Sequence, residues 1–204
     1  MIIARRGDSG TKVKIIQRIL HLIQDGKFGI NTEEAVRKFQ TEHKITSDGI
    51  VGSKTWSLLL GNSLGHSKRK ITEIIVHCSA TKKGKHYDAS DIRVWHKQQG
   101  WSDIGYHYVI LLDGTVQRGR NVDIAGAHCA GHNANSIGVC YIGGIGIDGR
   151  TPEDTRTQQQ KDAMQQLLLS LRIEYPQAQI WGHRDFAKKD CPSFDAHREY
   201  QYLM

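Results

Sequence analysis

The sequence has little of what marks a membrane protein or a disulfide-rich protein. It holds four cysteines and three prolines in 204 residues, and its longest uninterrupted apolar stretch runs from Tyr108 to Leu112. A membrane-spanning helix needs roughly 18 apolar residues, so we predict no membrane insertion. The first ten residues, MIIARRGDSG, carry two arginines where a secretory signal needs an apolar segment of about 7–15 residues. We therefore expect synthesis in the cytoplasm without a signal peptide, and reduced thiols.

The excess positive charge is confined to the first third of the chain. Residues 1–70 carry 13 Lys and Arg against 6 Asp and Glu, whereas residues 71–204 carry 15 of each sign. A basic region can bind a nucleic acid or an anionic envelope polymer. The first 70 residues show no interleaving of basic and aromatic side chains and no nucleic-acid motif. We therefore predict no specific nucleic-acid partner.

A short internal repeat organises the N-terminal part. Asp25–Gly29 (DGKFG) recurs 23 residues later as Asp48–Gly52 (DGIVG), and a threonine follows each copy by three positions. Asp-Gly favours a tight turn, because glycine tolerates positive φ. Apolar residues at helical spacing before, between and after the turns predict three short amphipathic helices. The first would contain Val13, Ile16, Ile19, Leu20 and Ile23, and Asn31 or Thr32 would cap the second.

This repeat resembles the type 1 peptidoglycan-binding domain, in which a leading helix precedes two D-G-x-[FV]-G turns, each followed by a helix. The resemblance covers roughly residues 7–60. It implies a three-helix domain over residues 1–62 that binds bacterial peptidoglycan, followed by a linker over residues 63–70. The alternative is a generic three-helix bundle that only stabilises its neighbour.

Residues 71–204 alternate between strand-like and helix-like segments. The predicted strands are ITEIIVHC (71–78), GYHYVILL (105–112), TVQR (115–118), SIGVCYIGG (136–144) and QIWGH (179–183). Asp113-Gly114 indicates a hairpin turn between the second and third of these. Helices are predicted after Ser90 or Asp91 and from about Gln158 to Glu174. The pattern predicts an α/β domain with a mixed central sheet flanked by helices.

Three potential metal ligands lie near the ends of these strands. His77 and His183 each end a strand, and Cys191 follows eight residues after the second histidine. Imidazole and thiolate ligands favour zinc over magnesium or calcium, and three protein ligands leave a fourth position for water, as in catalytic zinc sites. With 11 histidines in the chain, this spacing alone does not distinguish ligands from ordinary polar residues.

Longer motifs carry a second resemblance, which covers about residues 71–195. IIVHCSAT, WHKQQGW, GYHYVILLDGTVQRGR, AGAHCAGHNANSIGVCYIGG and KKDCPSFD resemble the type 2 N-acetylmuramoyl-L-alanine amidases, the zinc amidases typified by the lysozyme of the T-seven coliphage. That superfamily also includes the animal peptidoglycan recognition proteins. The resemblance implies a catalytic domain over residues 71–204 and one catalytic zinc ion held by His77, His183 and Cys191. It also implies that Tyr106 and Lys189 form the catalytic pair and that His128 lies in the substrate groove.

The remaining histidines and cysteines have plainer interpretations. His107 lies on the opposite strand face from Tyr106, which favours packing or support of a ligand over ligation. Cys78 and Cys140 are expected to be buried apolar side chains. Cys129, in a glycine-rich loop, has no predicted role.

Three classes of function fit these patterns. The first is a modular phage endolysin whose monomer cuts the amide between N-acetylmuramic acid and L-alanine after a separate membrane-permeabilising protein releases it to the wall. The second is a non-catalytic peptidoglycan receptor, and the third is a regulatory protein that binds another macromolecule. Receptors in the resembled superfamily typically lack the cysteine ligand, so Cys191 favours the enzyme.

Overall fold

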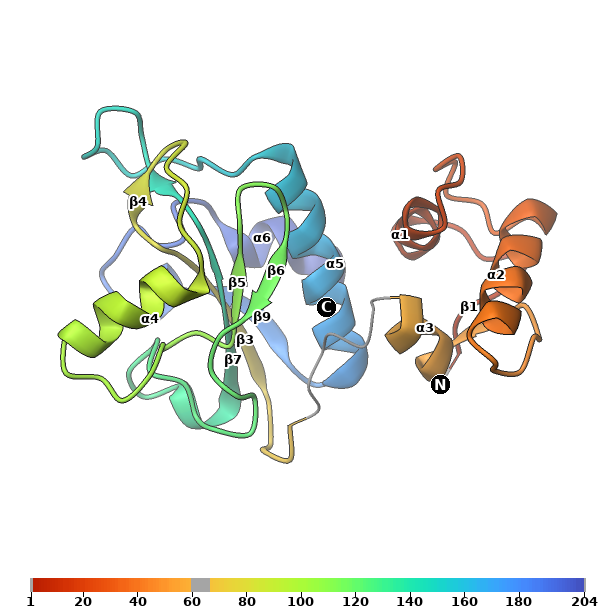
Figure 1. Cartoon of the computed structure of the whole chain (residues 1–204), viewed down its shortest axis with the longest axis horizontal. Helices are drawn as coiled ribbons and strands as arrows, with labels where there is room; N and C mark the ends of the chain where they lie inside the picture. The colour runs from red at the N-terminus through yellow and green to blue at the C-terminus, as the bar shows by residue number, and fades with distance from the viewer. Residues whose placement is uncertain (1, 60–66, 204) are drawn as a thin grey trace. The chain divides into compact units, whose positions relative to one another are not determined.

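The computed structural model describes residues 2–59 and 67–203, and the chain divides into two compact units, Met1–Leu64 and Gly65–Met204 (Figure 1). Each unit has its own apolar core. Within the described residues, no helix is both long enough and apolar enough to cross a membrane.

Over residues 2–59, the first unit contains three helices and a two-stranded sheet. The elements are β1 (Ile2–Ala4), α1 (Thr11–Ile19), α2 (Ile30–Glu42), β2 (Val51–Gly52) and α3 (Ser53–Leu59), with β1 antiparallel to β2. The two Asp-Gly turns form as predicted, since Gly26 and Gly49 adopt φ of 72° and 73°.

Two local predictions in this unit are wrong. The first helix ends at Ile19, because His21 turns into the left-handed region with φ of 55°. Ile23 therefore lies outside the helix and is 88% exposed. The second helix begins at Ile30 after Gly29, without a side-chain cap, and Thr32 lies buried inside it.

Each copy of the repeat is built around a buried glutamine that the sequence motif did not single out. Gln17 Nε2 donates to Asp25 Oδ1 at 2.7 Å and to Thr32 Oγ1 at 3.1 Å, and Gln17 Oε1 accepts from Gly26 N at 2.9 Å. The same contacts recur 23 residues later among Gln40, Asp48, Gly49 and Thr55, at 2.8, 3.1 and 2.9 Å. The turn and the helix after it are thus one hydrogen-bonded structure that occurs twice.

The second unit contains a five-stranded mixed sheet with the order β6-β5-β7-β3-β9. The strands are β3 (Glu73–Cys78), β5 (Tyr108–Ile110), β6 (Val116–Arg118), β7 (Ser136–Tyr141) and β9 (Gln179–Gly182). All pairings are parallel except the β5–β6 hairpin, which turns at the predicted Asp113-Gly114. Two short strands, β4 (Thr81–Lys82) and β8 (Gly144–Ile145), form a separate parallel two-stranded sheet.

Helices lie on both faces of this sheet (Figure 1), which confirms the predicted α/β class. One face is covered by α4 (Ala89–Gln98), whose cap is Asp88 in a capping box rather than the predicted Ser90 or Asp91. The long helix α5 (Gln158–Glu174) spans the predicted residues and is capped by Thr157. The short helix α6 (Ala196–Tyr200) packs against β9.

Candidate active site

The three predicted metal ligands lie together at the carboxyl ends of neighbouring strands. His77 is near the end of β3, and His183 follows β9 at the start of the short helix η2 (His183–Asp185). Because β3 pairs with β9 in parallel, with Val76 opposite Gly182, the two histidines lie side by side, with ring centroids 4.7 Å apart. One ring nitrogen of each histidine and Cys191 Sγ all lie within 4.8 Å of one another.

The loop that carries Cys191 is held by backbone contacts. Cys78 N donates to Cys191 Sγ at 3.3 Å, and Arg184 N donates to the Cys191 carbonyl at 2.7 Å. Tyr141 Oη donates to the Pro192 carbonyl at 2.8 Å, and Ser193 Oγ donates to the Gly144 carbonyl at 2.9 Å. The sulfur therefore has a defined position facing His77 Nδ1, at 3.8 Å.

The electrostatics of this cluster suit a metal cation. Burial, followed by the charges of neighbouring groups, lowers the pKa of His77 well below its ordinary value, and burial also lowers the pKa of His183. Both imidazoles are therefore neutral and have a lone pair to offer. Contact with Cys78, together with burial, raises the pKa of the Cys191 thiol. A coordinated divalent cation would offset that rise and hold the thiolate, so these residues fit a zinc ion.

His128 lies behind His77. It is buried, its Nδ1 lies 3.0 Å from His77 Nε2, and its Nε2 lies 3.3 Å from Ser136 Oγ. Gly126 and Gly138 make room for its ring, since a Cβ at either position would come within 2.6 Å of His128 Cδ2. The contact with His77 indicates that His128 orients that ring, a role that the sequence motif did not show. Substrate contact by His128 stays a prediction.

Tyr106 lies beside the cluster, and Lys189 lies two residues before Cys191 in the chain. The Tyr106 ring centroid is 5.0 Å from that of His77, and burial, followed by neighbouring thiols, raises the pKa of Tyr106 well above its ordinary value. Tyr106 therefore keeps its hydroxyl proton at neutral pH. Lys189 is exposed, and its charge adds to burial in lowering the pKa of His183, which places it within electrostatic reach of the cluster.

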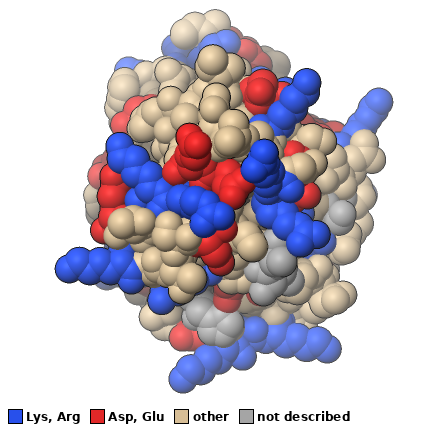
Figure 2. Space-filling view, turned by 90° about the vertical axis from the view of Figure 1, so that its right-hand side faces the viewer, with Lys and Arg blue, Asp and Glu red and all other residues tan. Residues whose placement is uncertain are grey.

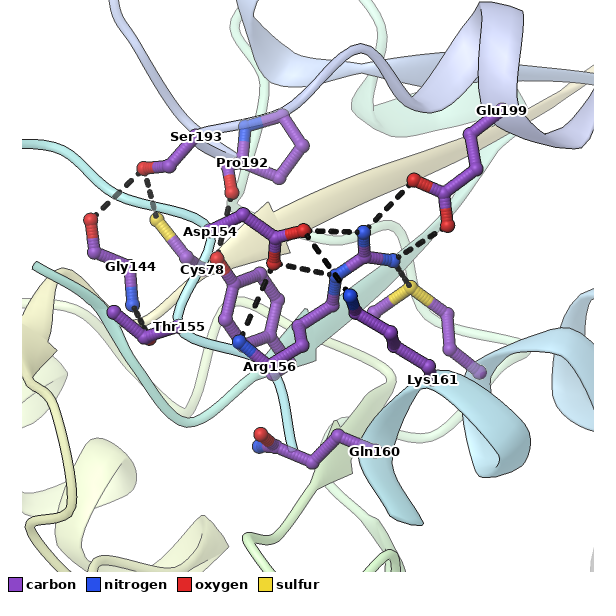
Figure 3. A network of polar contacts seen from close by, with 12 residues as sticks. Cys78, Gly144, Asp154, Thr155, Arg156, Gln160, Lys161, Pro192, Ser193 and Glu199 are labelled. Atoms are coloured by element: carbon purple, nitrogen blue, oxygen red, sulfur yellow. Dashed lines mark hydrogen bonds and ion pairs between the residues drawn. The ribbon is translucent and has the colours of Figure 1, made fainter. Parts of the chain in front are cut away.

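A buried arginine, Arg156, is the centre of a polar network near the loop that carries Pro192 and Ser193 (Figure 3). The Arg156 side chain is 0% exposed and contacts Asp154 and Glu199, with two nitrogen–oxygen distances of 2.8 Å to the former and distances of 2.8 and 3.0 Å to the latter. It also donates to Tyr200 Oη at 2.8 Å. Its guanidinium carbon lies 3.3 Å from the ring centroid of Phe194, three residues after Cys191. No sequence motif pointed to Arg156.

The other histidines and cysteines behave largely as predicted. Cys78 and Cys140 are buried, and all four cysteines are free thiols. His107 is buried, and burial lowers its pKa to about 4. Its Nδ1 accepts a hydrogen bond from Gly138 N at 2.9 Å, so it packs in the core rather than joining the three-ligand cluster. Cys129 is also buried, and burial raises its pKa.

Comparison with known proteins assigns this chain to a family. Residues 67–194 match the model of the N-acetylmuramoyl-L-alanine amidase family, and residues 9–59 match that of a peptidoglycan binding domain. The endolysin of Escherichia phage T7 is 44% identical over 128 residues, which cover 63% of this chain and 84% of that protein.

Two solved structures share the fold of the second unit. The N-acetylmuramoyl-L-alanine amidase LysC from Clostridium intestinale has a TM-score of 0.55 at 28% identity, covering 66% of this chain and 86% of that one. Drosophila PGRP-LB has a TM-score of 0.53 at 26% identity, covering 69% and 84%. The chain therefore belongs to the N-acetylmuramoyl-L-alanine amidase family of phage endolysins, with a peptidoglycan-binding domain on the N-terminal side of its amidase domain.

Proposed function

We propose that this protein is a zinc-dependent phage endolysin. It hydrolyses the amide bond between N-acetylmuramic acid and the L-alanine of the stem peptide, and its biological role is lysis of the host. The observation that carries the proposal is the convergence of His77, His183 and Cys191, the donor set of a catalytic zinc site, in a chain of the amidase family.

Each residue of the site has a separate role in hydrolysis of the amide bond. His77, His183 and Cys191 would hold the zinc ion, which would supply polarisation of the substrate carbonyl and a water whose pKa is lowered to about 7. Lys189 places a cation where negative charge develops on the carbonyl oxygen. Tyr106, which keeps its proton, positions the reacting groups by donating a hydrogen bond from its hydroxyl. His128 fixes the His77 ring so that Nδ1 faces Cys191 Sγ.

The N-terminal domain holds the enzyme on its polymeric substrate. We assign wall binding to residues 1–62 and catalysis to residues 71–204. Of the linker predicted over residues 63–70, residues 63–66 lie outside the described residues, whereas Ser67 is buried and both Ser67 Oγ and Arg69 Nε donate to the Val122 carbonyl at 2.8 Å, so residues 67–70 pack with the second unit. The match of residues 9–59 to a peptidoglycan binding domain supports this division. The protein acts as a monomer and reaches the wall after a separate protein has permeabilised the membrane.

Digestion products test the bond that is cut. Purified peptidoglycan treated with the enzyme is expected to gain free alanine amino termini while its glycan chains stay intact. Amino-terminal labelling and a reducing-sugar assay on one digest measure both quantities. New reducing ends without new amines would identify a glycosidase instead, and no change in either would favour a non-catalytic receptor.

Substitution of two adjacent lysines, Lys188 and Lys189, tests whether Lys189 stabilises the oxyanion or only contributes positive charge to the surface. Lys189→Met keeps the apolar stem and removes the cation, so turnover is expected to fall about 10²–10³-fold, as for loss of an oxyanion donor. Lys188→Met is the matched control and is expected to cost less than about tenfold, because an exposed charge seldom contributes more. Turnover of a soluble muramyl peptide, with zinc content and thermal stability measured in parallel, compares them. Equal losses would withdraw the role of Lys189.

A further inference from the structure

The first copy of the N-terminal repeat has a surface pocket with an apolar wall. The pocket has a volume of about 560 Å³ and is lined in part by His21, Leu22, Ile23, Lys27, Ile30 and Asn31. Ile23 is 88% exposed and Ile30 is 54% exposed. Isoleucine is among the residues most often buried, so two exposed copies on one pocket indicate a binding surface.

The second copy of the repeat shows that the scaffold does not require these isoleucines. The buried glutamine network is the same in both copies, and His21 and its counterpart Lys44 adopt nearly equal φ of 55° and 53°. At the positions 23 residues after Ile23 and Ile30, however, the second copy has Thr46 and Ser53. Since the same turn forms with polar residues there, the isoleucines serve something other than folding of the turn.

Charged and polar groups surround this apolar wall. Lys27 and His21 line the same pocket and are both exposed, and the exposed Asp25 carboxylate lines it beside Lys27. Residues 1–64 contain ten Lys and Arg against six Asp and Glu. In the view of Figure 2, basic side chains are intermixed with acidic ones rather than gathered into one stripe. Ion pairs such as Arg6–Glu33 and Arg37–Glu33 occur in this unit, so the charges that a ligand meets in the pocket are the local ones, the Lys27 ammonium and the Asp25 carboxylate.

We propose that this pocket binds the stem peptide of peptidoglycan rather than its glycan chain. The proposal rests on the proposed function, under which the peptide begins with alanine. Sugar rings pack on aromatic side chains, and none lines the pocket among the described residues. Leu22, Ile23 and Ile30 instead suit small alkyl side chains, and Lys27 suits a peptide carboxylate. The N-terminal domain then recognises the part of the wall that the second unit releases.

The test uses the full chain and a peptide that contains no bond for the amidase to cut. The probe is synthetic L-alanyl-γ-D-glutamyl-meso-diaminopimelyl-D-alanine, titrated into labelled protein and followed by amide NMR. Shifts are expected to concentrate between residues 21 and 32. Ile23→Ser with Ile30→Ser is expected to weaken the affinity about tenfold or more, since both apolar contacts are lost. Lys27→Gln is expected to weaken it less and to reduce its salt dependence.

The second repeat supplies the matched control. Thr46→Ala with Ser53→Ala changes the corresponding positions and is expected to leave peptide affinity unchanged. Hydrolysis of a soluble muramyl peptide is expected to be equal in all variants, which separates this proposal from the proposed function. If that hydrolysis or the thermal stability fell in the isoleucine variant, the pocket would be filled by the chain itself and the proposal would be wrong.

Three other results would also overturn the proposal. The first is peptide shifts confined to residues 67–203. The second is binding of an N-acetylglucosamine oligomer, but not of the peptide, at residues 21–32. The third is a dimer in sedimentation that the isoleucine substitutions dissociate, which would make a second copy of the chain the occupant.

Discussion

Replacing Cys191 with serine is expected to remove zinc and lower amidase turnover by at least about 10³-fold. A hydroxyl is a far poorer zinc ligand than a thiolate, and loss of a group that only orients a ligand already costs about 10–100-fold. Among the described residues, His77, His183 and Cys191 are the one group of three or more potential ligands whose atoms converge, so no second site is ready to hold the ion. Zinc content after dialysis and turnover of a muramyl peptide measure the two effects.

Cys78→Ser is the control for this substitution. Cys78 is buried next to Cys191, and its backbone N–H, which the substitution keeps, contacts the Cys191 sulfur at 3.3 Å. The variant is therefore expected to retain zinc. Loss of zinc from the Cys78 variant, combined with retention in the Cys191 variant, would mean that the ligand has been assigned to the wrong cysteine.

The sequence pattern placed His77 and His183 at strand ends, but it was the resemblance to the amidases, not the spacing, that singled out these histidines and Cys191 as ligands. Apolar segments that end in His77 and His183 become parallel neighbours, and parallel neighbours bring their carboxyl ends to one edge of the sheet. The order β6-β5-β7-β3-β9 was not predictable in the same way, because alternation of strands and helices does not specify which strands pair. The long helix was predicted well because its apolar residues recur at helical spacing over several turns; its Thr157 cap was not predicted.

The features that escaped prediction depend on contacts between distant residues. His128 supports His77 across 51 positions, and Gln17 reaches eight positions along the chain to the turn that it stabilises. Neither residue differs locally from an ordinary polar side chain. Ile23 was misplaced for a related reason, since helical spacing continues through it while the backbone reverses at His21. Helical spacing in a sequence shows which residues would share a helix face if the helix continued. The position at which the backbone turns determines which of them are in the helix.

Arg156 is the clearest case, because a lone arginine before a helix normally indicates a solvated charge. Here the Arg156 side chain is buried instead. Its guanidinium lies between two carboxylates, that of Asp154, two residues earlier, and that of Glu199, in α6 (Figure 3). Because Phe194 lies under the same guanidinium, the cation joins α6 to the loop that carries Cys191. Removing it would take this partner from Glu199, leave Asp154 with Lys161 Nζ at 3.8 Å, and leave the Phe194 ring without its cation.

Arg156→Met is accordingly expected to destabilise the second unit by about 3 kcal/mol, near the lower end of the range for breaking a buried ion pair. The lower end applies because the carboxylates left behind are partly exposed, at 28% for Asp154 and 40% for Glu199. In a unit of this size, the loss corresponds to a fall in Tm of about 6–12 °C. Calorimetry of the full chain measures the fall in Tm. Zinc transfer to a chelator is also expected to be faster in the variant, because Phe194 no longer anchors the cysteine loop.

Two further variants distinguish this ion-pair network from simple filling of space. Arg156→Lys keeps the charge but cannot contact both carboxylates with a planar fork, so its stability is expected to fall between those of the parent and Arg156→Met. Adding Glu199→Gln to Arg156→Met removes one of the unpaired charges and is expected to recover part of the loss. If Arg156→Met were as stable as the parent and kept its zinc equally long, the network would contribute nothing to the cysteine loop. A Tm that fell without faster zinc loss would restrict its role to holding α6 in place.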